Sequence, residues 1–298
     1  MKQLLILSGK GGTGKTTVAS AFIKLARARA YADCDVDAPN LHLVMEQGSE
    51  PRRTAYYGLP KALIDEQICI ECDLCRQYCR FDAISAEPVY EVDDYACEGC
   101  GVCEYICPVG AVSLHPAVAG ELSLYQNDAV FSTAQLKMGS GTSGKLVTEV
   151  KKQMMAASVG VDLAIIDGSP GIGCPVIASL SGVDMVLIIA EPSVSGISDM
   201  ERIIRTARQF QTKIAVCVNK YDTSPSNSEK ITAFCSLNSL PLLGFIPYDP
   251  EAVKAVNEGR SIVDVDCPSG RAVREVFEQA MNILGEEGGR GIRIPGNL

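Results

Sequence analysis

Short runs of apolar residues alternate with amphipathic segments over most of the chain. Runs of strand length lie at residues 4–8, 163–166, 185–190 and 214–218, and another strand ends at Asp33 to Asp35. Helical spacing lies between or after these runs, at residues 15–29, 143–157, 198–210, 228–237, 250–258 and 271–284. Buried strands that alternate with helices predict an α/β fold, with a doubly wound, mainly parallel sheet covered on both faces.

This alternation stops between residues 61 and 116. There CIECDLCRQYCRFDAIS, from Cys69, repeats after 28 residues as CEGCGVCEYICPVGAVS, from Cys97. A stretch of alternating residues follows at 121–137, and the α/β pattern then resumes. We therefore predict a small α+β domain over residues 61–116, inserted into one α/β domain made of residues 1–60 and 117–298.

Composition narrows the class of protein further. The net charge of −9 disfavours general binding to nucleic acid or anionic lipid. No run approaches the roughly 18 consecutive apolar residues of a membrane span, so a cytoplasmic protein is expected. In that reducing compartment, 13 cysteines favour metal ligation over disulfides. The Gly-rich end, residues 285–298, is expected to be mobile.

A glycine-rich loop follows the first strand and opens the first helix. Its sequence, GKGGTGKT, fits G-x-x-x-x-G-K-[ST], in which backbone N–H groups and a helix N-terminus converge on phosphate oxygens. We expect Lys15 to neutralise the β- and γ-phosphates and Thr16 to bind Mg²⁺. The predicted nucleotide-binding residues of this loop are Gly9, Gly11, Gly12, Thr13, Gly14, Lys15, Thr16 and Thr17.

The segment KGGTGKT, from Lys10 to Thr16, resembles the modified phosphate loop of the MinD/ParA superfamily of ATPases. The resemblance continues through the α/β part of the chain. It implies that dimerisation depends on ATP and that Lys10 reaches the phosphates of the partner subunit. The dimer would be a homodimer or a heterodimer with a related ATPase.

Two aspartate segments extend the resemblance. DCDVDAPNL, from Asp33, implies that Asp35 orients the attacking water and that Asp33 supports Mg²⁺, although helix capping or turn formation by the Asp, Pro and Asn residues is the structural alternative. DGSPG, from Asp167, implies that Asp167 holds a water on Mg²⁺ and that Gly171 faces the γ-phosphate. This segment follows an apolar strand, and open α/β sheets bind ligands at the carboxyl ends of their strands.

The base of the nucleotide has two interpretations. VNKYD, at residues 218–222, contains NKxD, which places an aspartate against guanine in GTPases. In MinD-like ATPases the Asn after this strand, here Asn219, contacts adenine, and an Ile-Pro strand end, here at Pro247, packs on the base. Because NKxD is only four residues long and the resemblance spans the chain, we favour ATP over GTP.

The cysteine repeat has the spacing of a bacterial ferredoxin with two [4Fe–4S] clusters. Three thiolates on one tight loop reach one cubane, and the fourth cysteine ligates the other. We assign Cys69, Cys72, Cys75 and Cys107 to one cluster, and Cys97, Cys100, Cys103 and Cys79 to the other. Zinc competes less well, because structural zinc usually places a longer loop between two C-x₂-C knuckles. One departure is Arg80, which follows Cys79 where the ferredoxin pattern has Pro.

With its insertion, the chain resembles MinD-superfamily ATPases that contain an inserted ferredoxin domain. Outside the repeat, Cys34, Cys217 and Cys235 are expected to pack in or near the core. Cys174 lies seven residues after Asp167. In the nitrogenase iron protein, a relative, a cysteine near this place helps to bridge two subunits through a cluster. Bridging needs two cysteines per subunit, and no second candidate is visible here.

These motifs lead to one functional hypothesis and two alternatives. The hypothesis is that ATP binding and hydrolysis gate electron transfer through the two clusters to a redox partner protein. The alternatives are an Mrp-like carrier that passes on Fe–S clusters, and a positioning ATPase of the MinD/ParA kind with structural or sensory clusters. No membrane or nucleic acid partner is expected, since the chain is acidic and its tail lacks the basic amphipathic helix that MinD uses.

Overall fold

The computed structural model describes residues 1–45 and 48–285. Its contacts divide the chain into two compact units. The first comprises Met1–Arg52, Ser123–Ala134 and Gly144–Leu298, and the second comprises Arg53–Leu122 and Gln135–Ser143. The second unit contains all of residues 61–116 and further residues on either side. That residues 61–116 form a domain of their own stays a prediction, and the expected mobile tail lies outside the described residues from 286 onward.

A nine-stranded sheet has the order β13–β12–β11–β1–β10–β2–β9–β8–β3. Its strands from β13 to β9 pair in parallel, as predicted. The bounds are β1 Lys2–Leu7, β2 Ala30–Asp33, β3 Arg52–Tyr57, β8 Val118–Gln126, β9 Val130–Leu136, β10 Leu163–Asp167, β11 Met185–Ala190, β12 Lys213–Asn219 and β13 Leu242–Ile246. The register places Asp167 beside Asp33, so two of the predicted site residues end neighbouring strands.

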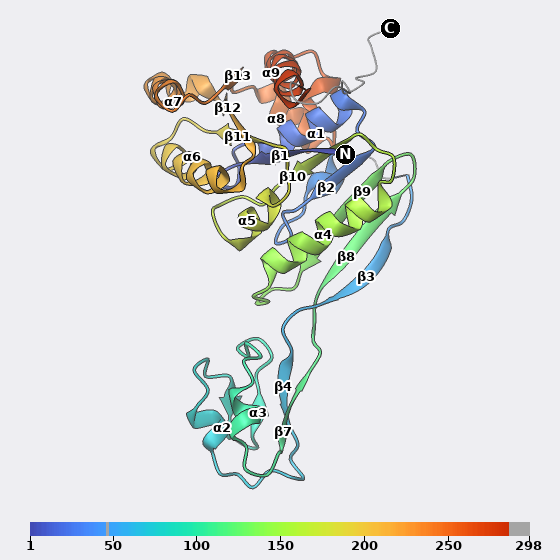
Figure 1. The fold of residues 1–298 in the computed structure, drawn as a ribbon, viewed down its shortest axis with the longest axis vertical. Helices are drawn as coiled ribbons and strands as arrows, with labels where there is room; N and C mark the ends of the chain where they lie inside the picture. Colours follow the sequence, from blue (N-terminus) through green and yellow to red (C-terminus); the bar gives the residue numbers. More distant parts are fainter. Residues whose placement is uncertain (46–47, 286–298) are drawn as a thin grey trace. The chain divides into compact units, whose positions relative to one another are not determined.

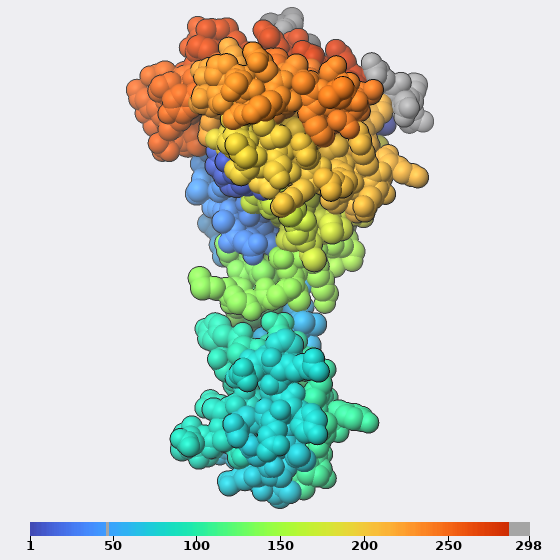
Figure 2. Space-filling model, turned by 90° about the vertical axis from the view of Figure 1, so that its left-hand side faces the viewer, coloured from blue at the N-terminus to red at the C-terminus, as the bar shows by residue number. Residues whose placement is uncertain are grey.

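Helices cover both faces of the sheet's parallel part. In Figure 1, α1, α8 and α9 lie on one side, and α4, α5 and α6 lie on the other. Figure 2 views the molecule from the side of α6 and α7, which form the yellow and orange surface there. The bounds are α1 Lys15–Ala26, α4 Ser143–Ala157, α5 Cys174–Leu180, α6 Val194–Ala207, α7 Pro225–Leu237, α8 Pro250–Asn257 and α9 Pro268–Gly285, with single 3₁₀ turns at Leu41–Leu43, Arg208–Phe210, Tyr221–Thr223 and Ile262–Asp264.

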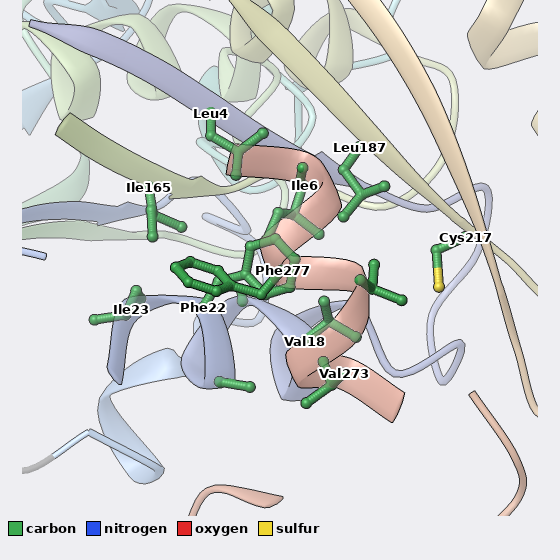
Figure 3. Packing of buried hydrophobic residues seen from close by; sticks show 14 of the residues in the cluster. Leu4, Ile6, Val18, Phe22, Ile23, Ile165, Leu187, Cys217, Val273 and Phe277 are labelled. Carbon is green, nitrogen blue, oxygen red and sulfur yellow. The ribbon is translucent and has the colours of Figure 1, made fainter. Parts of the chain in front are cut away.

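Alternate residues of the strands fill a core beneath α1 and α9. Leu4 and Ile6 of β1 are fully buried there. The rings of Phe22 and Phe277 meet edge to face, with their centroids 5.2 Å apart (Figure 3). Burial of one such side chain stabilises the fold by about 1.5–3 kcal/mol. This packing fixes α1, and with it the glycine-rich loop that precedes it.

Several helix ends differ from the predicted ones, and two of these differences have clear local reasons. The helix predicted at residues 15–29 ends at Ala26, because Arg27 adopts a left-handed conformation with φ of 46°. The helix predicted from residue 198 begins at Val194, because the Ser193 side chain caps it by accepting the Gly196 N–H at 3.1 Å. The predicted helix at residues 143–157 matches α4 residue for residue.

The second unit contains two small antiparallel ladders and two short helices. β4 (Lys61–Ile64) pairs with β7 (Val112–His115), and β5 (Ile84–Ser85) pairs with β6 (Glu91–Val92). The helices are α2 (Leu74–Gln77) and α3 (Val102–Ile106). A small apolar core lies among them and includes Ile64, Ala83, Ile84 and Val112. Within the described residues, no helix of either unit has the length and apolar character that crossing a membrane requires.

Candidate functional site

The loop between β1 and α1 excludes side chains at two of its glycines. A Cβ on Gly9 would lie 2.2 Å from Asp199 Cβ, and one on Gly14 would lie 2.3 Å from Asn219 Nδ2. Gly14 also has φ of 88°, where it precedes α1, and no side chain of the described residues caps that helix. The residues at the start of α1, from Gly14 to Thr17, line a cavity, so their uncapped backbone N–H groups are available to an anion there.

Lys15 and Asp167 form a buried ion pair at the base of this loop. Their side chains are 6% and 0% exposed, and Thr16 Oγ1 donates to the second Asp167 oxygen at 2.7 Å. Burial acts to lower the pKa of Lys15, but the carboxylates of Asp167 and Asp33 outweigh it and the pKa is raised. The site thus places a fixed positive charge beside a carboxylate and a hydroxyl, the groups predicted to bind phosphate and Mg²⁺.

Asp33 holds the loop that carries Asp35. Its carboxylate accepts the N–H groups of Asp35 at 3.0 Å, Asn40 at 2.9 Å and Leu41 at 3.0 Å. This is the turn-forming role that the sequence left as an alternative, and support of Mg²⁺ by Asp33 stays a prediction. Asp35 lines the same cavity as Lys10, Lys15 and Thr16.

The buried carboxylates predict a pH dependence of stability in the nucleotide-free protein. Burial, followed by the charge of Asp167, raises the pKa of Asp33 from 3.8 to about 7. The folded state therefore binds a proton more tightly than the unfolded state, and stability falls as pH rises between these values. We expect Asp33 to contribute a slope of at most about 1.4 kcal/mol per pH unit.

Denaturant unfolding of wild type and Asp33→Asn, without nucleotide or Mg²⁺, checks this expectation at pH values from 5 to 8. The difference in free energy of unfolding between wild type and variant should change with pH in that window. A constant difference would show that Asp33 ionises normally in the folded protein. Asp37→Asn is the matched control, since it changes a nearby aspartate outside the buried group.

Lys10 is paired within its own chain. Its Nζ lies 2.9 Å from a Glu191 carboxylate oxygen and donates to Ser193 Oγ at 3.2 Å. Lys220 lies 3.8 Å from the other Glu191 oxygen and donates to the Gly12 carbonyl at 2.8 Å. Glu191 and Ser193 were not predicted from the sequence. Only their position at the end of β11, at the same sheet edge as the glycine-rich loop, could have indicated them.

The loop borders two cavities, which share Gly12, Gly14, Thr17, Val256 and Asn257 in their linings. One is lined by the loop from Lys10 to Thr17 and by Asp35 and Pro170. The other is more apolar and is lined by Asn219, Lys220, Ile246, Pro247 and Val256 among others. The first has charges that suit phosphates, and the more apolar lining of the second suits a base. Gly171 is not among the lining residues, and its N–H donates to the Ser8 carbonyl at 3.1 Å.

Two side chains of VNKYD are already engaged. Asn219 Nδ2 donates to the Thr13 carbonyl at 2.6 Å, which ties the strand end to the glycine-rich loop. Asp222, the aspartate of NKxD, accepts the Tyr248 N–H at 2.8 Å. That bond fixes the segment after Pro247 and occupies a carboxylate oxygen that a guanine would need. The arrangement agrees better with an adenine site.

Comparison with known proteins decides the family. Residues 4–262 match the model of the CobQ/CobB/MinD/ParA nucleotide-binding domain. The chain belongs to this family. It is 30% identical to the uncharacterized protein MJ0578 of Methanocaldococcus jannaschii, over 95% of this chain and 97% of that protein. It is also 25% identical to the septum site-determining protein MinD of Bacillus subtilis, over 95% and 89%.

Solved structures of the family share the fold. MinD of Pyrococcus horikoshii OT3, complexed with Mg-ADP, superposes with a TM-score of 0.58 at 18% identity, covering 97% of this chain and 99% of that one. Cyanothece McdA(D38A) in its ATP complex gives 0.56 at 20% identity, covering 97% and 98%. The family therefore accounts for the parallel sheet and for the glycine-rich loop at its edge.

Two cavities of the second unit are each lined by four cysteines of the repeat. One has Cys69, Cys72, Cys75 and Cys107 in its lining. The other has Cys79, Cys97, Cys100 and Cys103. These are the two sets that the sequence spacing predicted. Among the described residues, no group of three or more His, Cys, Asp or Glu side chains is arranged around a single metal ion, so each set lines a cavity without converging on one point.

Backbone bonds cross between the two halves of the repeat. The Asp65 N–H donates to the Ala111 carbonyl at 2.8 Å, and 28 residues later Asp93 N–H donates to the Ala83 carbonyl at 2.8 Å. Each bond brings the start of one cysteine loop to the residue four positions after the last cysteine of the other half. The two halves of the repeat are therefore related by a pseudo-symmetry. As a result, the last cysteine of each half, Cys79 or Cys107, lines the cavity of the other half.

Left-handed residues recur at equivalent places in the halves. Glu71, Asp73 and Asp82 have φ of 55°, 63° and 51°, and Gly99, Gly101 and Gly110, each 28 residues later, have φ of 60°, 78° and 66°. A non-glycine residue in this region costs about 1–2 kcal/mol. The first half thus keeps a strained loop shape without glycine.

Some sulfur atoms of the repeat accept N–H groups. The Ala111 N–H lies 3.2 Å from Cys107 Sγ, and the Glu71 N–H lies 3.5 Å from Cys69 Sγ. Such bonds stabilise thiolates. Of the cysteines outside the repeat, Cys34, Cys217 and Cys235 are buried as predicted, whereas Cys174 is exposed at the start of α5.

Proposed function

We propose that the chain is an ATP-hydrolysing iron–sulfur protein whose nucleotide state gates electron transfer through two [4Fe–4S] clusters to a partner protein. The observation that carries the proposal is the presence, in one polypeptide, of a phosphate cavity around Lys15 and of two cavities lined by four cysteines each. In each cycle ATP and water give ADP and phosphate. A one-electron donor protein is oxidised, and the acceptor protein is reduced.

The positions of the nucleotide-site residues support the following roles. Lys15, freed from Asp167 by the incoming phosphates, would neutralise the β- and γ-oxygens as charge moves to the leaving group. Thr16 and Asp167 would face the Mg²⁺, which when bound supplies further charge neutralisation. Asp35 lies on the loop held by Asp33 and would orient the attacking water. Membership of the family and the engaged Asp222 carboxylate favour ATP over GTP.

The cysteine sets fit [4Fe–4S] clusters in donor number and chemistry. Each cavity offers four thiols, and N–H groups already point at two of the sulfur atoms. Residues 69–79 and 97–107 would hold the clusters. When bound, such clusters supply one-electron transfer with little structural rearrangement. The chain's part is to fix the thiolates on two loops of matching shape.

The charge distribution supports a basic redox partner. Residues 61–116 contain eleven Asp and Glu against three Lys and Arg, a net charge of −8 out of −9 for the whole chain. Tyr105 and Tyr95 are 91% and 79% exposed on the same unit. Acidic surfaces steer basic proteins by long-range attraction. We therefore expect the association rate with the partner to fall steeply as ionic strength rises.

Anaerobic purification tests the proposal. We expect about eight irons and eight inorganic sulfides per chain, EPR signals of reduced [4Fe–4S] clusters, and ATPase activity in the same sample. Redox titration with ADP and with a non-hydrolysable ATP analogue should give different cluster potentials. Equal potentials and equal rates of acceptor reduction in both states would exclude gating.

A positioning ATPase is the second candidate, because several relatives are named septum site-determining protein MinD, at 22–27% identity. In that case the subcellular distribution of a fluorescent fusion would depend on Lys15 and be unaffected by serine substitutions in both cysteine sets. An even distribution that does not change with Lys15→Ala would speak against positioning. A carrier role predicts instead that iron leaves the protein for an apo-protein acceptor.

The in-chain pairing of Lys10 predicts an effect on dimerisation. If Lys10 binds the partner's phosphates, it must first leave Glu191. A half-exposed pair of this kind is worth on the order of 1 kcal/mol, so Glu191→Gln should tighten the ATP-dependent dimer about fivefold. Sedimentation with a non-hydrolysable ATP analogue measures this, with Glu229→Gln on the exposed face of α7 as control. A weaker or unchanged dimer in Glu191→Gln would contradict the role given to Lys10.

A further inference from the structure

Helix α5 follows directly from the loop that is expected to sense the γ-phosphate. Gly171, whose N–H donates to the Ser8 carbonyl at 3.1 Å, lies three residues before Cys174, the first residue of α5. With only seven residues, α5 is short. Any displacement of Gly171 on nucleotide exchange must therefore shift or rotate α5, unless the intervening Ile172 and Gly173 absorb it.

Helix α4 holds α5 at both ends. At the first end, Gly144 packs so closely on Cys174 that a Cβ there would lie 3.1 Å from both Cys174 Cβ and the Cys174 carbonyl oxygen. At the other end, Lys151 Nζ donates to the carbonyls of Ser179 at 2.7 Å and Ser181 at 2.6 Å. These contacts leave α5 little freedom to move independently of α4.

Lys151 is an unusual residue for such a contact. Its side chain is buried, and burial lowers its pKa from 10.5 to about 8. An apolar side chain would pack here without the desolvation that an ammonium suffers. The lysine, unlike an apolar residue, donates two directed hydrogen bonds from α4 to carbonyls at the end of α5. These carbonyls have no partners within the helix. The helix dipole also favours a cation at this end.

The opposite side of α4 is bonded to strands β8 and β9. Gln153 Nε2 donates to the Ser123 carbonyl at 3.2 Å and to Ser132 Oγ at 3.0 Å. Ser132 Oγ in turn donates to the Val150 carbonyl at 2.7 Å. Both strands continue along the chain into the second unit, β8 at Leu122 and β9 at Gln135, and α4 itself begins at Ser143, the last residue of that unit.

We propose that Lys151 is a positioning residue that couples the nucleotide site to the cysteine-bearing unit, by making α4 move together with α5. The coupling runs from Gly171 through α5 to Lys151 and Gly144, and then through α4 to β8, β9 and residues 135–143. All of these contacts lie within the first unit, and the second unit is reached along the covalent chain. This inference rests on the proposed gating by the nucleotide, and it names a residue through which the gating would act.

Hydrogen exchange with mass spectrometry tests the coupling in the full-length, cluster-loaded protein. Exchange of peptides covering residues 135–143 is compared with ADP and with a non-hydrolysable ATP analogue. In wild type we expect a nucleotide-dependent difference in exchange rate, and in Lys151→Met we expect this difference to shrink at least tenfold. Basal ATPase activity should stay within about threefold of wild type, since Lys151 lines neither nucleotide cavity.

Lys152→Met is the matched control. Lys152 is the next residue of α4, but its side chain is 65% exposed and pairs with Glu149 on the helix surface. It should keep the nucleotide-dependent difference of wild type. If Lys151→Met does not fold, Gly144→Ala takes its place, because its methyl group would push α4 from Cys174 at the other end of α5. Lys151→Arg, which retains directed donors, should restore at least part of the difference.

The outcomes separate this inference from the proposed function. A full nucleotide-dependent difference in Lys151→Met, or in Gly144→Ala when that variant is used, overturns the role of α4. Equal exchange in the two states of wild type overturns it as well. A difference in exchange without any difference in cluster potential supports the mechanical coupling and contradicts the gating of electron transfer. If wild type shows a nucleotide-dependent difference in both exchange and cluster potential, and Lys151→Met loses both, the result supports the role of α4 and the gating of electron transfer.

Discussion

Lys15→Met should slow ATP hydrolysis strongly and also destabilise the nucleotide-free protein. The first effect follows from the loss of the charge that faces the phosphates, and we expect the hydrolysis rate to fall by roughly 10²–10³-fold. The second follows from the buried pair, since Asp167 and Asp33 are both fully buried and would lose their nearest cation. Breaking such a pair from one side costs about 3–5 kcal/mol.

A double variant separates the two effects. Lys15→Met with Asp167→Asn removes both charges, so most of the lost stability should return while hydrolysis stays at least as slow as in Lys15→Met. Phosphate release measures the first property, and thermal or denaturant unfolding without nucleotide measures the second. If Lys15→Met proved as stable as wild type without nucleotide, the buried pair would contribute nothing to the fold. If the double variant hydrolysed ATP, the assignment of Lys15 to the phosphates would be wrong.

The sheet could be predicted because its strands are buried on both faces. Continuous apolar runs that are too short for a typical helix and lie between helices indicate buried strands. Residues 185–190 match β11 residue for residue. Helix ends were harder. The left-handed Arg27 and the cap at Ser193 depend on single backbone angles and one side-chain bond, which periodicity does not encode.

The candidate site could be predicted only where it is local in sequence. The glycine-rich loop and the cysteine repeat carry their geometry in their spacing. The pairing of Lys10 with Glu191 joins residues about 180 positions apart, and it follows from the parallel pairing of β1 with β11. Lys151 is a similar case. A lysine on an amphipathic helix is expected to face solvent, and only the position of α5 makes Lys151 a buried hydrogen-bond donor.

The exchange of the fourth cysteine between the halves predicts how substitutions combine. Cys69→Ser and Cys107→Ser act on the same proposed cluster, so each should lower the iron content from about eight to about four per chain. Their double variant should lose no more iron than either alone. Cys69→Ser with Cys79→Ser acts on both proposed clusters, and this double variant should lose nearly all of its iron.

The physical reason is that one missing thiolate opens one iron of a cubane to solvent, whereas the second cubane keeps its four ligands. Iron and sulfide counts on anaerobic samples measure the losses, and EPR of the reduced protein shows which signal disappears. Cys217→Ala, in the buried part of β12, is the control and should keep all of the iron. If Cys69→Ser with Cys79→Ser retained half of the iron while Cys69→Ser with Cys107→Ser lost all of it, each half would hold its own cluster. The backbone bonds from Asp65 to Ala111 and from Asp93 to Ala83 would then have no bearing on ligation.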